Sequence, residues 1–575
     1  MISQSTTAGR FVLSQASGAT GQPLIEQTLG DFFRDMAARH PGRDALISAH
    51  QARRYTYSQL HAEVRRLASA LLGLGLAKGD RIGIWSHNNA EWVLMQFATA
   101  QVGLVLVNIN PAYRSAEVEY AINKVGCKAI VTMPSFKTSD YLGMLRELSP
   151  ELATALPGAL KAARLPTLRT VVWIDEAGVG DEQPGMLRFS DLLARGEASD
   201  ARIDPIAATL RNTDAINIQF TSGTTGFPKG ATLTHRNILN NGFFIGECMR
   251  LTSEDRLCIP VPLYHCFGMV LGNLACVTHG AAIVYPGDGF DPLKVLETVQ
   301  AERCTGLHGV PTMFIAELDH PRFAEFDLST LRTGIMAGSP CPIEVMKRVV
   351  KDMNLSEITI AYGMTETSPV SCQSDNDTPL EKRVSTVGKV QPHLDMKIIH
   401  PETGEVLPVG QSGELCTRGY SVMLGYWGDE DRTREAIDAE GFMHTGDLAT
   451  MDDEGYVNIV GRIKDMVIRG GENIYPREVE EFLYRHPKVQ DVQVVGVPDQ
   501  RYGEELCAWV ITKPGEKLVE EEIREFCKGQ IAHYKVPRYI RFVTSFPMTV
   551  TGKIQKFRIR DQMKDELGLE DARSA

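Results

Sequence analysis

A buried strand that runs into a glycine- and hydroxyl-rich loop constrains the fold of this chain most. Residues 215–220 (AINIQF) have the composition of a buried strand, and residues 221–230 (TSGTTGFPKG) follow without a break. Glycines let backbone N–H groups turn toward an anion, hydroxyls add donors, and the lysine adds a point charge. Because α/β proteins place ligands at strand ends, the sequence predicts a polyphosphate site here. Its expected contacts are Thr221, Ser222, Gly223, Thr224, Thr225, Gly226 and Lys229.

This loop differs from a Walker loop. Pro228 stands five residues after Gly223, whereas the Walker motif needs a second glycine there, followed by lysine and a hydroxyl residue. The alternative interpretation is a solvated Ser/Thr/Gly turn. The concentration of glycines, hydroxyls and a lysine in ten residues favours the phosphate site.

Strand-like and amphipathic helical stretches alternate along most of the chain. Runs such as 81–85 (RIGIW), 129–132 (AIVT) and 170–174 (TVVWI) have the length and composition of buried strands. The alternation is typical of βαβ units and predicts an α/β fold. From about residue 395, short strand runs with Gly, Pro and Asp turns indicate a β-rich subdomain.

The last part of the chain reads as a separate α+β unit. Strand runs at 489–497, 506–512 and 539–544 surround a helix at 520–527, and the charged segment 461–465 (GRIKD) precedes them. A plain linker is the alternative to a hinge in that segment. We therefore predict an N-terminal arm (1–26), a large domain of α/β subdomains plus a β-rich subdomain (27–461), a hinge (462–465) and a small mobile α+β domain (466–575).

Composition narrows the class of protein. The chain has 575 residues, of which 43% are hydrophobic, so it can bury a large core. Its formal charge of −12 argues against nucleic acid as the main partner, because such binding needs a basic stripe. The eleven cysteines include no C-x-x-C pair, so we expect neither a zinc site nor a disulfide framework. A reducing compartment fits best, namely the cytoplasm, or the mitochondrial matrix in a eukaryote.

No segment has the pattern of a membrane span. Polar residues interrupt the two most apolar stretches, 92–107 and 267–285, which a lipid-facing helix would rarely tolerate. Residues 1–24 share the acid-free composition of a transit peptide but lack its basic, amphipathic repetition. We expect a loosely ordered arm there.

Three further motifs follow strand-like runs or a tight turn. The run 361–367 (AYGMTET) offers Tyr362 for packing on a base and Glu366 for Mg²⁺, which is usually held by one or two carboxylates with substrate phosphates. The run 444–447 (HTGD) places an acceptor for ribose hydroxyls after an expected tight turn. The run 337–340 (AGSP) could present backbone to a flat base. Taken singly, each has an ordinary turn or core residue as its alternative.

In this order, the motifs resemble those of the adenylate-forming superfamily, which contains acyl-CoA synthetases, luciferase-type enzymes and peptide-synthetase adenylation domains. The resemblance covers about residues 27–560 and finishes with 547–553 (PMTVTGK). The runs 262–268 (PLYHCFG) and 468–476 (IRGGENIYP) look like those of acyl-CoA synthetases, with the medium-chain type most similar.

The resemblance implies a reaction in two steps. A carboxylic acid and Mg-ATP give acyl-adenylate and pyrophosphate, and coenzyme A then displaces AMP to form a thioester. The resemblance implies medium-chain or branched aliphatic acids as substrates. Residues 267–272 are apolar or small and suit an aliphatic tail, of which each buried CH₂ contributes about 0.8 kcal/mol, but they do not set chain length or branching. Two alternatives stay open. One is an adenylate former with another fate for the acyl group, either transfer to a carrier protein or oxidation as in luciferase-type enzymes, and the other is a catalytically silent nucleotide-binding protein. The oligomeric state is also open, with a homodimer as one option.

The same resemblance implies roles for individual residues. Lys553 would reach from the small domain to the carboxylate and the α-phosphate, and His265 would gate the acyl channel. Glu366 and Thr221 would hold Mg²⁺, with Thr365 in the same catalytic group. The nucleotide contacts implied beyond the loop are Gly338, Ser339, Pro340, Tyr362, Gly363, Met364, Asp447 and Arg462. Coenzyme A contacts are implied at Gly470, Gly471 and Glu472, with Lys464 at the hinge. For Arg462, Lys464 and His265, a purely structural role is the alternative.

Overall fold

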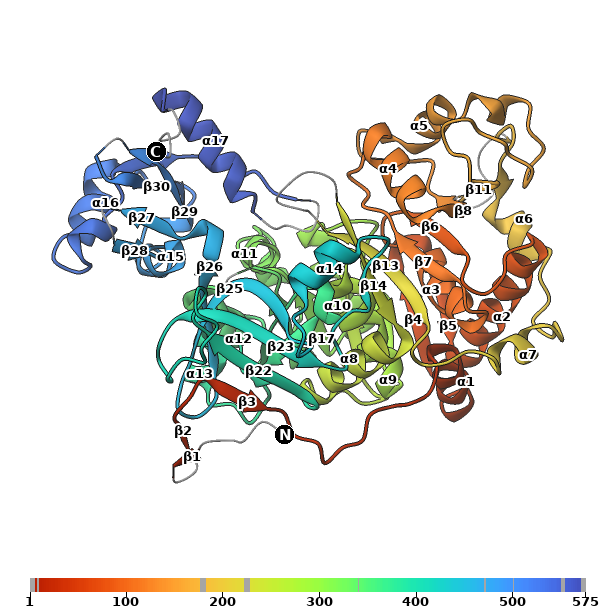
Figure 1. The fold of residues 1–575 in the computed structure, drawn as a ribbon, viewed down its shortest axis with the longest axis horizontal. Helices are drawn as coiled ribbons and strands as arrows, with labels where there is room; N and C mark the ends of the chain where they lie inside the picture. Colours follow the sequence, from red (N-terminus) through yellow and green to blue (C-terminus); the bar gives the residue numbers. More distant parts are fainter. Residues whose placement is uncertain are drawn as a thin grey trace.

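Four large sheets organise the chain. The computed structural model describes residues 6–7, 10–175, 182–221, 228–339, 341–469, 472–499, 501–549 and 554–569. Within these ranges lie one eight-stranded sheet, one nine-stranded sheet and two five-stranded sheets, besides two small ribbons. Figure 1 shows the eight-stranded sheet at one end of the molecule and the C-terminal sheet at the other, with the remaining two between them. The predicted α/β class is confirmed.

The eight-stranded sheet has the order β12-β11-β8-β6-β7-β13-β14-β24. Strands β12 to β13 in this order are parallel, and β14 and β24 extend the sheet antiparallel. The strands are β6 (Arg81–Trp85), β7 (Val105–Asn108), β8 (Cys127–Thr132), β11 (Thr170–Trp173), β12 (Leu187–Arg188), β13 (Ala215–Thr221), β14 (Lys229–Thr234) and β24 (Gly425–Tyr426). The helices around it are α1 (Leu29–Arg39), α2 (Tyr57–Gly73), α3 (Ala90–Gln101), α4 (Ser115–Val125), α5 (Tyr141–Leu148), α6 (Phe189–Ala194), α7 (Ile203–Ala207) and α8 (His235–Cys248).

Two of these helices show why the sequence folds locally as it does. A capping box starts α2, because the Thr56 hydroxyl accepts from the N–H of Gln59 while the Gln59 side chain accepts from the N–H of Thr56. Helix α3 is buried along its whole length, and two of its polar side chains have partners there: Glu91 pairs with Arg53, and Gln96 accepts a hydrogen bond from Asn273 over 2.9 Å. The resulting core is tightly packed, with the rings of Trp85 and Tyr141 stacked 3.9 Å apart.

The nine-stranded sheet has the order β21-β20-β19-β18-β17-β15-β16-β4-β5, with a parallel centre and antiparallel edges. Its strands are β4 (Asp44–Ser48), β5 (Arg53–Thr56), β15 (Arg256–Cys258), β16 (Ala282–Tyr285), β17 (Gly306–Gly309), β18 (Thr333–Ala337), β19 (Glu357–Gly363), β20 (Val370–Gln373) and β21 (Lys389–Val390). The associated helices are α9 (Ala275–His279), α10 (Pro292–Glu302), α11 (Pro311–Leu318), α12 (Ile343–Asp352) and α13 (Leu380–Ser385). A π-helix, η3 (Phe267–Leu274), runs directly into α9.

The β-rich subdomain is an antiparallel sheet of order β26-β25-β23-β22-β3. Its elements are β3 (Gln15–Ser17), β22 (Leu394–Ile399), β23 (Gly413–Gly419), β25 (Met443–Met451), β26 (Val457–Arg462) and helix α14 (Glu430–Ala436). Strand β3 comes from the segment that we expected to be a loosely ordered arm. Instead it pairs with β22, and the Ser17 hydroxyl donates to Asp395 over 2.6 Å. A three-residue edge strand is too short to be visible in the sequence pattern.

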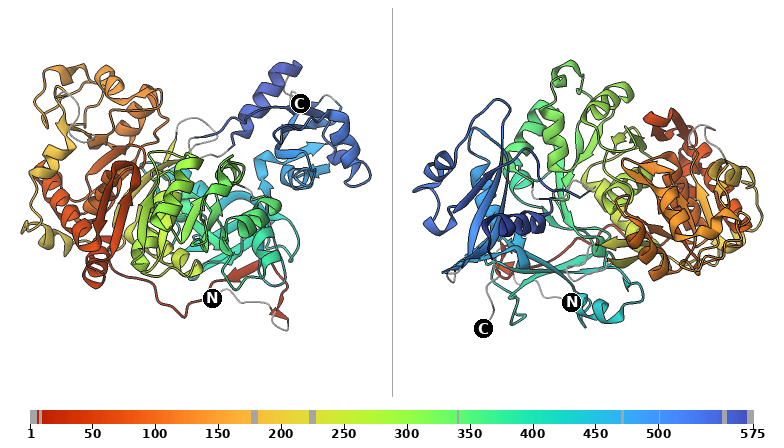
Figure 2. Two further views of the ribbon diagram at one scale, coloured as in Figure 1. Left: turned by 180° about the vertical axis from the view of Figure 1, so that it is seen from behind. Right: turned by 90° about the horizontal axis from the view of Figure 1, so that it is seen from above.

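The C-terminal unit contains the predicted strands and helix. Strands β27 (Val467–Arg469), β28 (Glu472–Ile474), β29 (Val489–Asp499), β30 (Gly503–Thr512) and β31 (Tyr539–Phe542) pack against α15 (Pro476–Leu483), α16 (Glu520–Cys527) and α17 (Lys556–Leu567). They enclose separate hydrophobic clusters, which include Val492, Leu506 and Ile523. The turn η6 (Ile463–Asp465) follows β26 and leads into this unit, which lies to one side of the large body in Figure 2.

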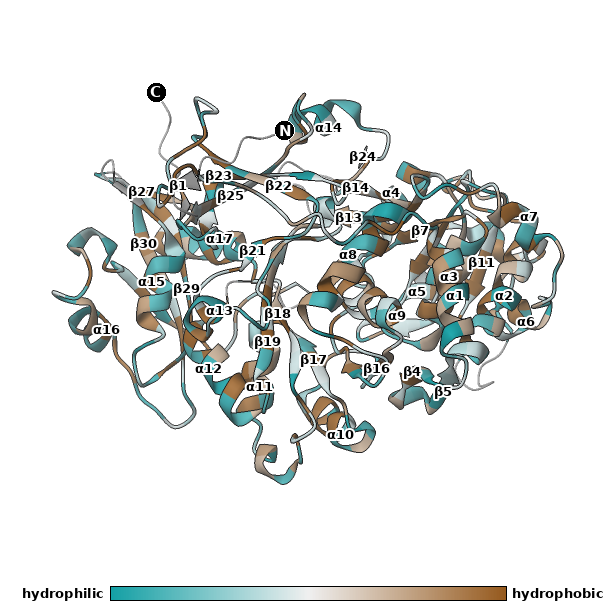
Figure 3. Ribbon diagram, turned by 90° about the horizontal axis from the view of Figure 1, so that it is seen from below, coloured by the Kyte–Doolittle hydropathy of each residue, from teal (hydrophilic) through white to brown (hydrophobic). Residues whose placement is uncertain are grey.

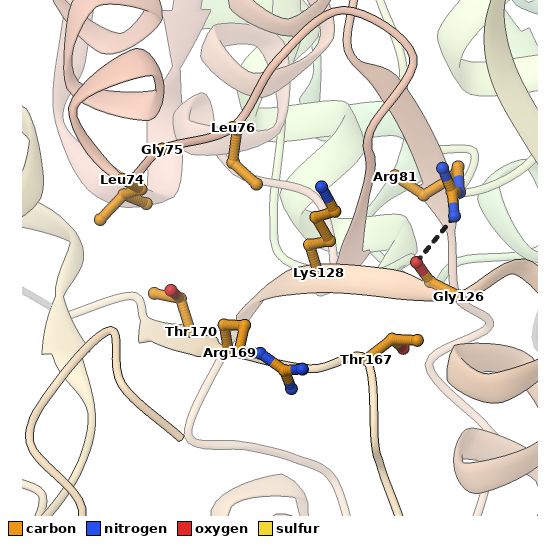
Figure 4. A pocket seen from close by; sticks show the side chains of 9 residues that line it. All are labelled: Leu74, Gly75, Leu76, Arg81, Gly126, Lys128, Thr167, Arg169 and Thr170. Atoms are coloured by element: carbon orange, nitrogen blue, oxygen red, sulfur yellow. Dashed lines mark hydrogen bonds between the residues drawn. The ribbon is translucent and has the colours of Figure 1, made fainter. Parts of the chain in front are cut away.

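A cavity of about 420 Å³ lies at the N-terminal ends of β6, β8 and β11. It is at the opposite end of these strands from the edge where α/β proteins bind ligands. Arg81, Lys128 and Arg169 line this cavity, which could suggest a site for an anion. The Arg81 guanidinium, however, already donates to the carbonyls of Val125 (2.7 Å) and Gly126 (3.2 Å); Figure 4 shows the second of these bonds. This cavity is therefore not the candidate active site.

Hydropathy follows the layers of the fold. In Figure 3, apolar residues gather on helices packed against the sheets, such as α8 and α9, whereas α14 is mostly hydrophilic. Of the helices in the described ranges, none combines the length and the apolar character needed to cross a bilayer.

Candidate active site

Strand ends from the two large sheets meet at Glu366. Strand β13 ends at Thr221, and β19 ends at Gly363, which leads into the short turn η5 (Thr365–Thr367). The Thr221 hydroxyl donates to Oε1 of Glu366 over 3.3 Å, and the Tyr426 hydroxyl donates to the same oxygen over 2.8 Å. Glu366 is only 5% exposed. The contacts therefore fix a buried carboxylate beside the start of the predicted phosphate loop.

Lys229 joins this group from the far end of the loop. Its ammonium donates to the Tyr426 hydroxyl over 3.1 Å and lies 4.2 Å from the centre of that ring. Burial, and next the carboxylate of Glu366, raise the pKa of Tyr426 far above its usual value, so its hydroxyl stays a donor. We call Thr221, Lys229, Glu366 and Tyr426 the phosphate-side network.

Tyr426 was missed by the sequence analysis. It lies on β24, a two-residue strand whose partner β14 is almost two hundred positions earlier in the chain, with Ala231 opposite Tyr426. The segment has no local pattern that would mark a functional tyrosine. The only local signal for a functional residue was an aromatic pair, residues 426–427, between two glycines.

The backbone around Glu366 requires a glycine at position 363. A Cβ atom on Gly363 would lie 1.7 Å from the carbonyl oxygen of Pro369, so no other residue fits without movement. The Thr367 hydroxyl donates to the carbonyl of Pro369 over 2.6 Å and accepts the N–H of Met364 over 3.2 Å. The 7% exposed Thr365 lies in the same turn, so the turn is held rigidly at the strand end.

Asp447 lies on a bulge rather than on the tight turn that we predicted. On β25, His444 pairs with Cys416 and Leu448 pairs with Glu414, so three residues (445–447) on this strand lie opposite the single residue 415 on β23. Gly446, in the middle of the bulge, has a positive φ of 69°. The sequence HTGD reads as a turn, but tertiary pairing with β23 keeps it within a strand. The bulge turns the 7% exposed Asp447 toward β19.

Asp447 has two partners that the sequence analysis assigned to the nucleotide site. Its Oδ2 accepts a hydrogen bond of 2.7 Å from the Tyr362 hydroxyl, and its Oδ1 is 3.1 Å from Nε of Arg462. Burial and the Asp447 carboxylate raise the pKa of Tyr362 well above its usual value. Arg462 is opposite Asp447 in the ladder between β25 and β26. The structure thus brings together Tyr362, Asp447 and Arg462.

The run after β18 lies beside this group. Gly338 follows the end of β18 with a φ of 91°, and Ser339 comes next, while Ala337 is opposite Ala361 in the neighbouring strand β19. The backbone of residues 338–339 and the ring of Tyr362 therefore occupy adjacent strand ends. Such a surface suits a flat base.

His265 belongs to a second group of residues, at the start of η3. Its Nδ1 accepts the N–H of Phe267 over 3.2 Å, and all eight residues of η3 are buried. A buried His308 accepts the N–H of Ile335 at Nδ1 (3.1 Å) and so donates from Nε2 to the carbonyl of Leu271 (2.9 Å). Because π-helical segments are frequent at functional sites, η3 is a candidate wall for an acyl chain.

Several predicted residues lie outside the described residues, and their roles stay predictions. Of the others, Lys464 is in the turn η6, Met364 joins β19 to η5, and Glu472 begins β28. The residues outside the described ranges are Ser222, Gly223, Thr224, Thr225, Gly226, Pro340, Gly470, Gly471 and Lys553.

The oxygen ligands at this site suit a hard cation. Mg²⁺ prefers one or two carboxylates together with substrate phosphates, and Glu366 with the Thr221 hydroxyl offers such donors. The carboxylate is buried and held by two hydroxyl donors, so it is already oriented. The residues present therefore fit Mg²⁺.

Comparison with known proteins identifies the family. The model of the AMP-binding enzyme family matches residues 33–427, and that of the AMP-binding enzyme C-terminal domain matches residues 478–553. The chain is 50% identical over 541 residues to YngI of Bacillus subtilis, which carries the name of an acyl-CoA synthetase (94% of this chain, 97% of YngI). It is 48% identical over 562 residues to the mitochondrial medium-chain acyl-CoA ligase ACSF2 of Bos taurus (97% of this chain, 91% of the relative).

A solved structure agrees with this result. The anthranilate CoA ligase AuaEII, in complex with anthranoyl-AMP, has a TM-score of 0.84 and 27% identity, covering 96% of this chain and 99% of AuaEII. The two family models together span both the large part of the chain and its C-terminal unit. The chain therefore belongs to the AMP-binding family of adenylate-forming enzymes, in its group of acyl-CoA synthetases and ligases.

Proposed function

We propose that this chain is an AMP-forming acyl-CoA ligase that activates medium-chain or branched aliphatic acids. The observation that carries the proposal is the phosphate-side network, in which the hydroxyls of Thr221 and Tyr426 donate to the buried Glu366 and Lys229 donates to Tyr426. The names of the Bacillus and bovine relatives support coenzyme A as the acceptor, and the bovine name supports a medium-chain acid.

The first step is the electrostatically difficult one, because a carboxylate must approach an anionic triphosphate. An oxygen of the acid attacks the α-phosphorus while the bond from that phosphorus to the oxygen bridging to the β-phosphate breaks, and pyrophosphate leaves. Lys229 and the hydroxyls of the loop would bind the outer phosphates, and Lys553 would place its ammonium at the α-phosphate. Such preorganised donors stabilise the charge that develops in the transition state.

Glu366 and Thr221 would hold Mg²⁺ at this end of the site. When bound, the ion neutralises phosphate charge and orients the phosphate oxygens. Thr365 would contribute to the same turn. Lys229 and the hydroxyls of the loop, rather than Glu366, would contact the phosphates directly.

The nucleoside would lie between the two groups of strand ends. Asp447 would accept hydrogen bonds from the ribose hydroxyls, with Arg462 beside it. Adenine would pack on Tyr362 and on the backbone of residues 338–340 and 363–364. Tyr362 would therefore act twice, as a packing surface and as the donor that orients Asp447.

In the second step the thiol of coenzyme A attacks the acyl carbonyl carbon, the bond from that carbon to the AMP oxygen breaks, and the thiol proton passes to solvent. Gly470, Gly471 and Glu472 would border the pantetheine channel. We propose that the small domain (466–575) turns about the hinge (462–465, with Lys464) against the large domain (27–461) between the steps, so that one site serves both. His265 would separate the acyl channel, walled by η3, from the reacting centre.

The test is AMP release by the purified protein with Mg-ATP and a panel of acids, each with and without coenzyme A. The panel contains butanoate, octanoate, palmitate, 2-methylhexanoate and benzoate. We expect AMP and acyl-CoA only when acid and coenzyme A are both present, with octanoate or the branched acid preferred. Exchange of pyrophosphate into ATP without acylation of coenzyme A would indicate a carrier-protein acceptor. No turnover in either assay would favour a silent nucleotide-binding protein.

A smaller effect is expected for Tyr362→Phe, which keeps the ring and removes the donor to Asp447. A hydrogen bond to a carboxylate contributes about 1.5–3 kcal/mol, but Asp447 keeps its contact with Arg462, so we expect only part of that loss in the KM for ATP, a rise of about two- to tenfold. The kcat should change less, because Asp447 keeps its contact with Arg462. Initial rates across an ATP titration, at saturating acid and coenzyme A, measure both quantities.

Tyr484→Phe is a matched control. The Tyr484 hydroxyl also donates to a buried aspartate, Asp491, but this pair lies in the C-terminal unit. The control should lower thermal stability without changing the KM for ATP. An unchanged KM for ATP in Tyr362→Phe would show that the Tyr362 hydroxyl does not orient Asp447 for ATP binding.

A further inference from the structure

Two paired strands bring three metal-ligating side chains together beside the bulge that holds Asp447. Glu414 and Cys416 are two residues apart on β23, so they share a face, and His444 on β25 is directly opposite Cys416. In the part of the chain that the structure describes, these three form the one group of at least three His, Cys, Asp or Glu residues whose ligand atoms all lie within 4.8 Å of one another. We call them the bulge cluster.

The distances within the bulge cluster match a tetrahedral metal site. Nδ1 of His444 is 3.6 Å from Sγ of Cys416 and 3.0 Å from Oε2 of Glu414. With zinc bonds of about 2.3 Å to sulfur and about 2.0–2.2 Å to nitrogen and oxygen, two ligands on one tetrahedral ion lie roughly 3.3–3.6 Å apart. Little movement would be needed to admit an ion. The donors would reach it from both strands of a rigid ladder.

The hydrogen-bond partners of these three side chains are also of the kind found around bound metal ions. Nε2 of His444 faces the carboxylate of Asp438 over 3.5 Å, and a histidine that binds a metal through one nitrogen usually gives its other N–H to a carboxylate. Asp438 is itself held, because its Oδ1 accepts the N–H groups of Glu440 and Phe442, each over 2.9 Å. The second oxygen of Glu414 accepts the N–H of Gly446 over 3.1 Å. The ligands are therefore oriented before any ion arrives.

We propose that Glu414, Cys416 and His444 bind a zinc-type divalent cation, with water as the fourth ligand. A set of thiolate, imidazole and carboxylate is borderline-soft and selects zinc or cobalt over magnesium, so this site is separate from Glu366. Cys416 is buried, whereas the side chains of His444 and Glu414 are 30% and 12% exposed, which opens a path from solvent. The sequence analysis expected no zinc site because the chain has no C-x-x-C pair, and these three ligands come together only through the pairing of β23 with β25.

The cation would regulate nucleotide binding, a consequence that rests on the proposed function. Glu414 would bind the ion with one oxygen and Gly446 with the other, and His444 directly precedes the bulge. An ion would therefore hold the bulge in the conformation that presents Asp447. Linkage requires that AMP raise the affinity for the ion by the same factor by which the ion raises the affinity for AMP. We expect that factor to be between about two and tenfold, the size of one ordered hydrogen bond.

The test uses the full chain, stripped of metal with a chelator and titrated with Co²⁺ and Zn²⁺. Wild type should bind one equivalent, with a thiolate-to-cobalt charge-transfer band in the near ultraviolet, and Zn²⁺ affinity is read by competition with a chromogenic chelator. Cys416→Ser should lose the band and bind Zn²⁺ at least tenfold more weakly, and His444→Gln should also bind more weakly. Asp438→Asn should keep the band and lose about 10–100-fold in affinity, as expected for an outer partner.

Cys507→Ser is the matched control, because Cys507 is also a buried strand cysteine but lies in the C-terminal unit. It should leave the band and the affinity unchanged. Absence of the band in wild type, or its survival in Cys416→Ser, overturns the site even if the protein is an active ligase. Zinc binding with unchanged AMP affinity overturns the regulatory role alone. If wild type binds Zn²⁺ as expected but shows no ligase activity, only the proposed function is contradicted.

Discussion

Glu366→Gln is expected to raise the Mg²⁺ concentration needed for half-maximal adenylation about 10–100-fold, since even outer partners of metal ligands have effects of that size. Glutamine keeps an oxygen that can accept from Thr221 and Tyr426, so the turn should stay folded, but it removes the negative charge. Pyrophosphate release at saturating ATP and octanoate, measured across a Mg²⁺ titration, gives the half-maximal concentration.

Glu317→Gln provides the matched control. Glu317 on α11 is only 1% exposed, and burial raises the pKa of its carboxyl group well above the usual value, which favours its neutral form. Its replacement should leave the Mg²⁺ titration unchanged. An identical titration for wild type and Glu366→Gln would show that Glu366 does not bind the metal.

Lys553→Ala is expected to slow acyl-adenylate formation by about 10²–10³-fold, the usual loss when one preorganised donor to a developing charge is removed. Thioester formation from preformed acyl-adenylate and coenzyme A should change little, because the lysine would then have left the reacting centre. Two assays separate these effects. Pyrophosphate release measures the first half-reaction, and acyl-CoA formation from synthetic octanoyl-AMP measures the second.

Two variants of the same domain test this interpretation. Lys528→Ala removes an exposed lysine that pairs with Glu525 on the surface, and it should affect neither half-reaction. Replacing Gly471 with leucine should do the reverse of Lys553→Ala, because the side chain would narrow the channel for pantetheine. Equal losses of both half-reactions in Lys553→Ala would contradict the account with two conformations.

Local patterns were enough to predict several elements. The strand expected at 81–85 is β6, the helix expected at 520–527 is α16, and the run 413–419 is β23. These segments have strong periodicity, and the buried face of each is clear from a short window of sequence. The phosphate loop was also predicted from adjacent glycines and hydroxyls, but its centre lies outside the described residues, so its role stays a prediction.

Long-range pairing accounts for what the sequence analysis missed. Strand β3 is visible only through its partner β22, and Tyr426 enters the phosphate-side network only because β24 pairs with β14. The HTGD run reads locally as a turn, yet the pairing of β25 with β23 makes it a bulge. Two- and three-residue strands carry too little pattern to be identified alone.

The sequence by itself determined the class of fold, the family resemblance and the predicted ligands of ATP, because each depends on residues that are neighbours in the chain. Only the tertiary structure decided which side chains meet. The contact between Thr221 and Glu366 joins residues 145 positions apart, and that between Tyr362 and Asp447 joins residues 85 positions apart. The bulge cluster likewise depends on one ladder register, since a shift by a single residue would turn Cys416 or His444 to the other face of the sheet.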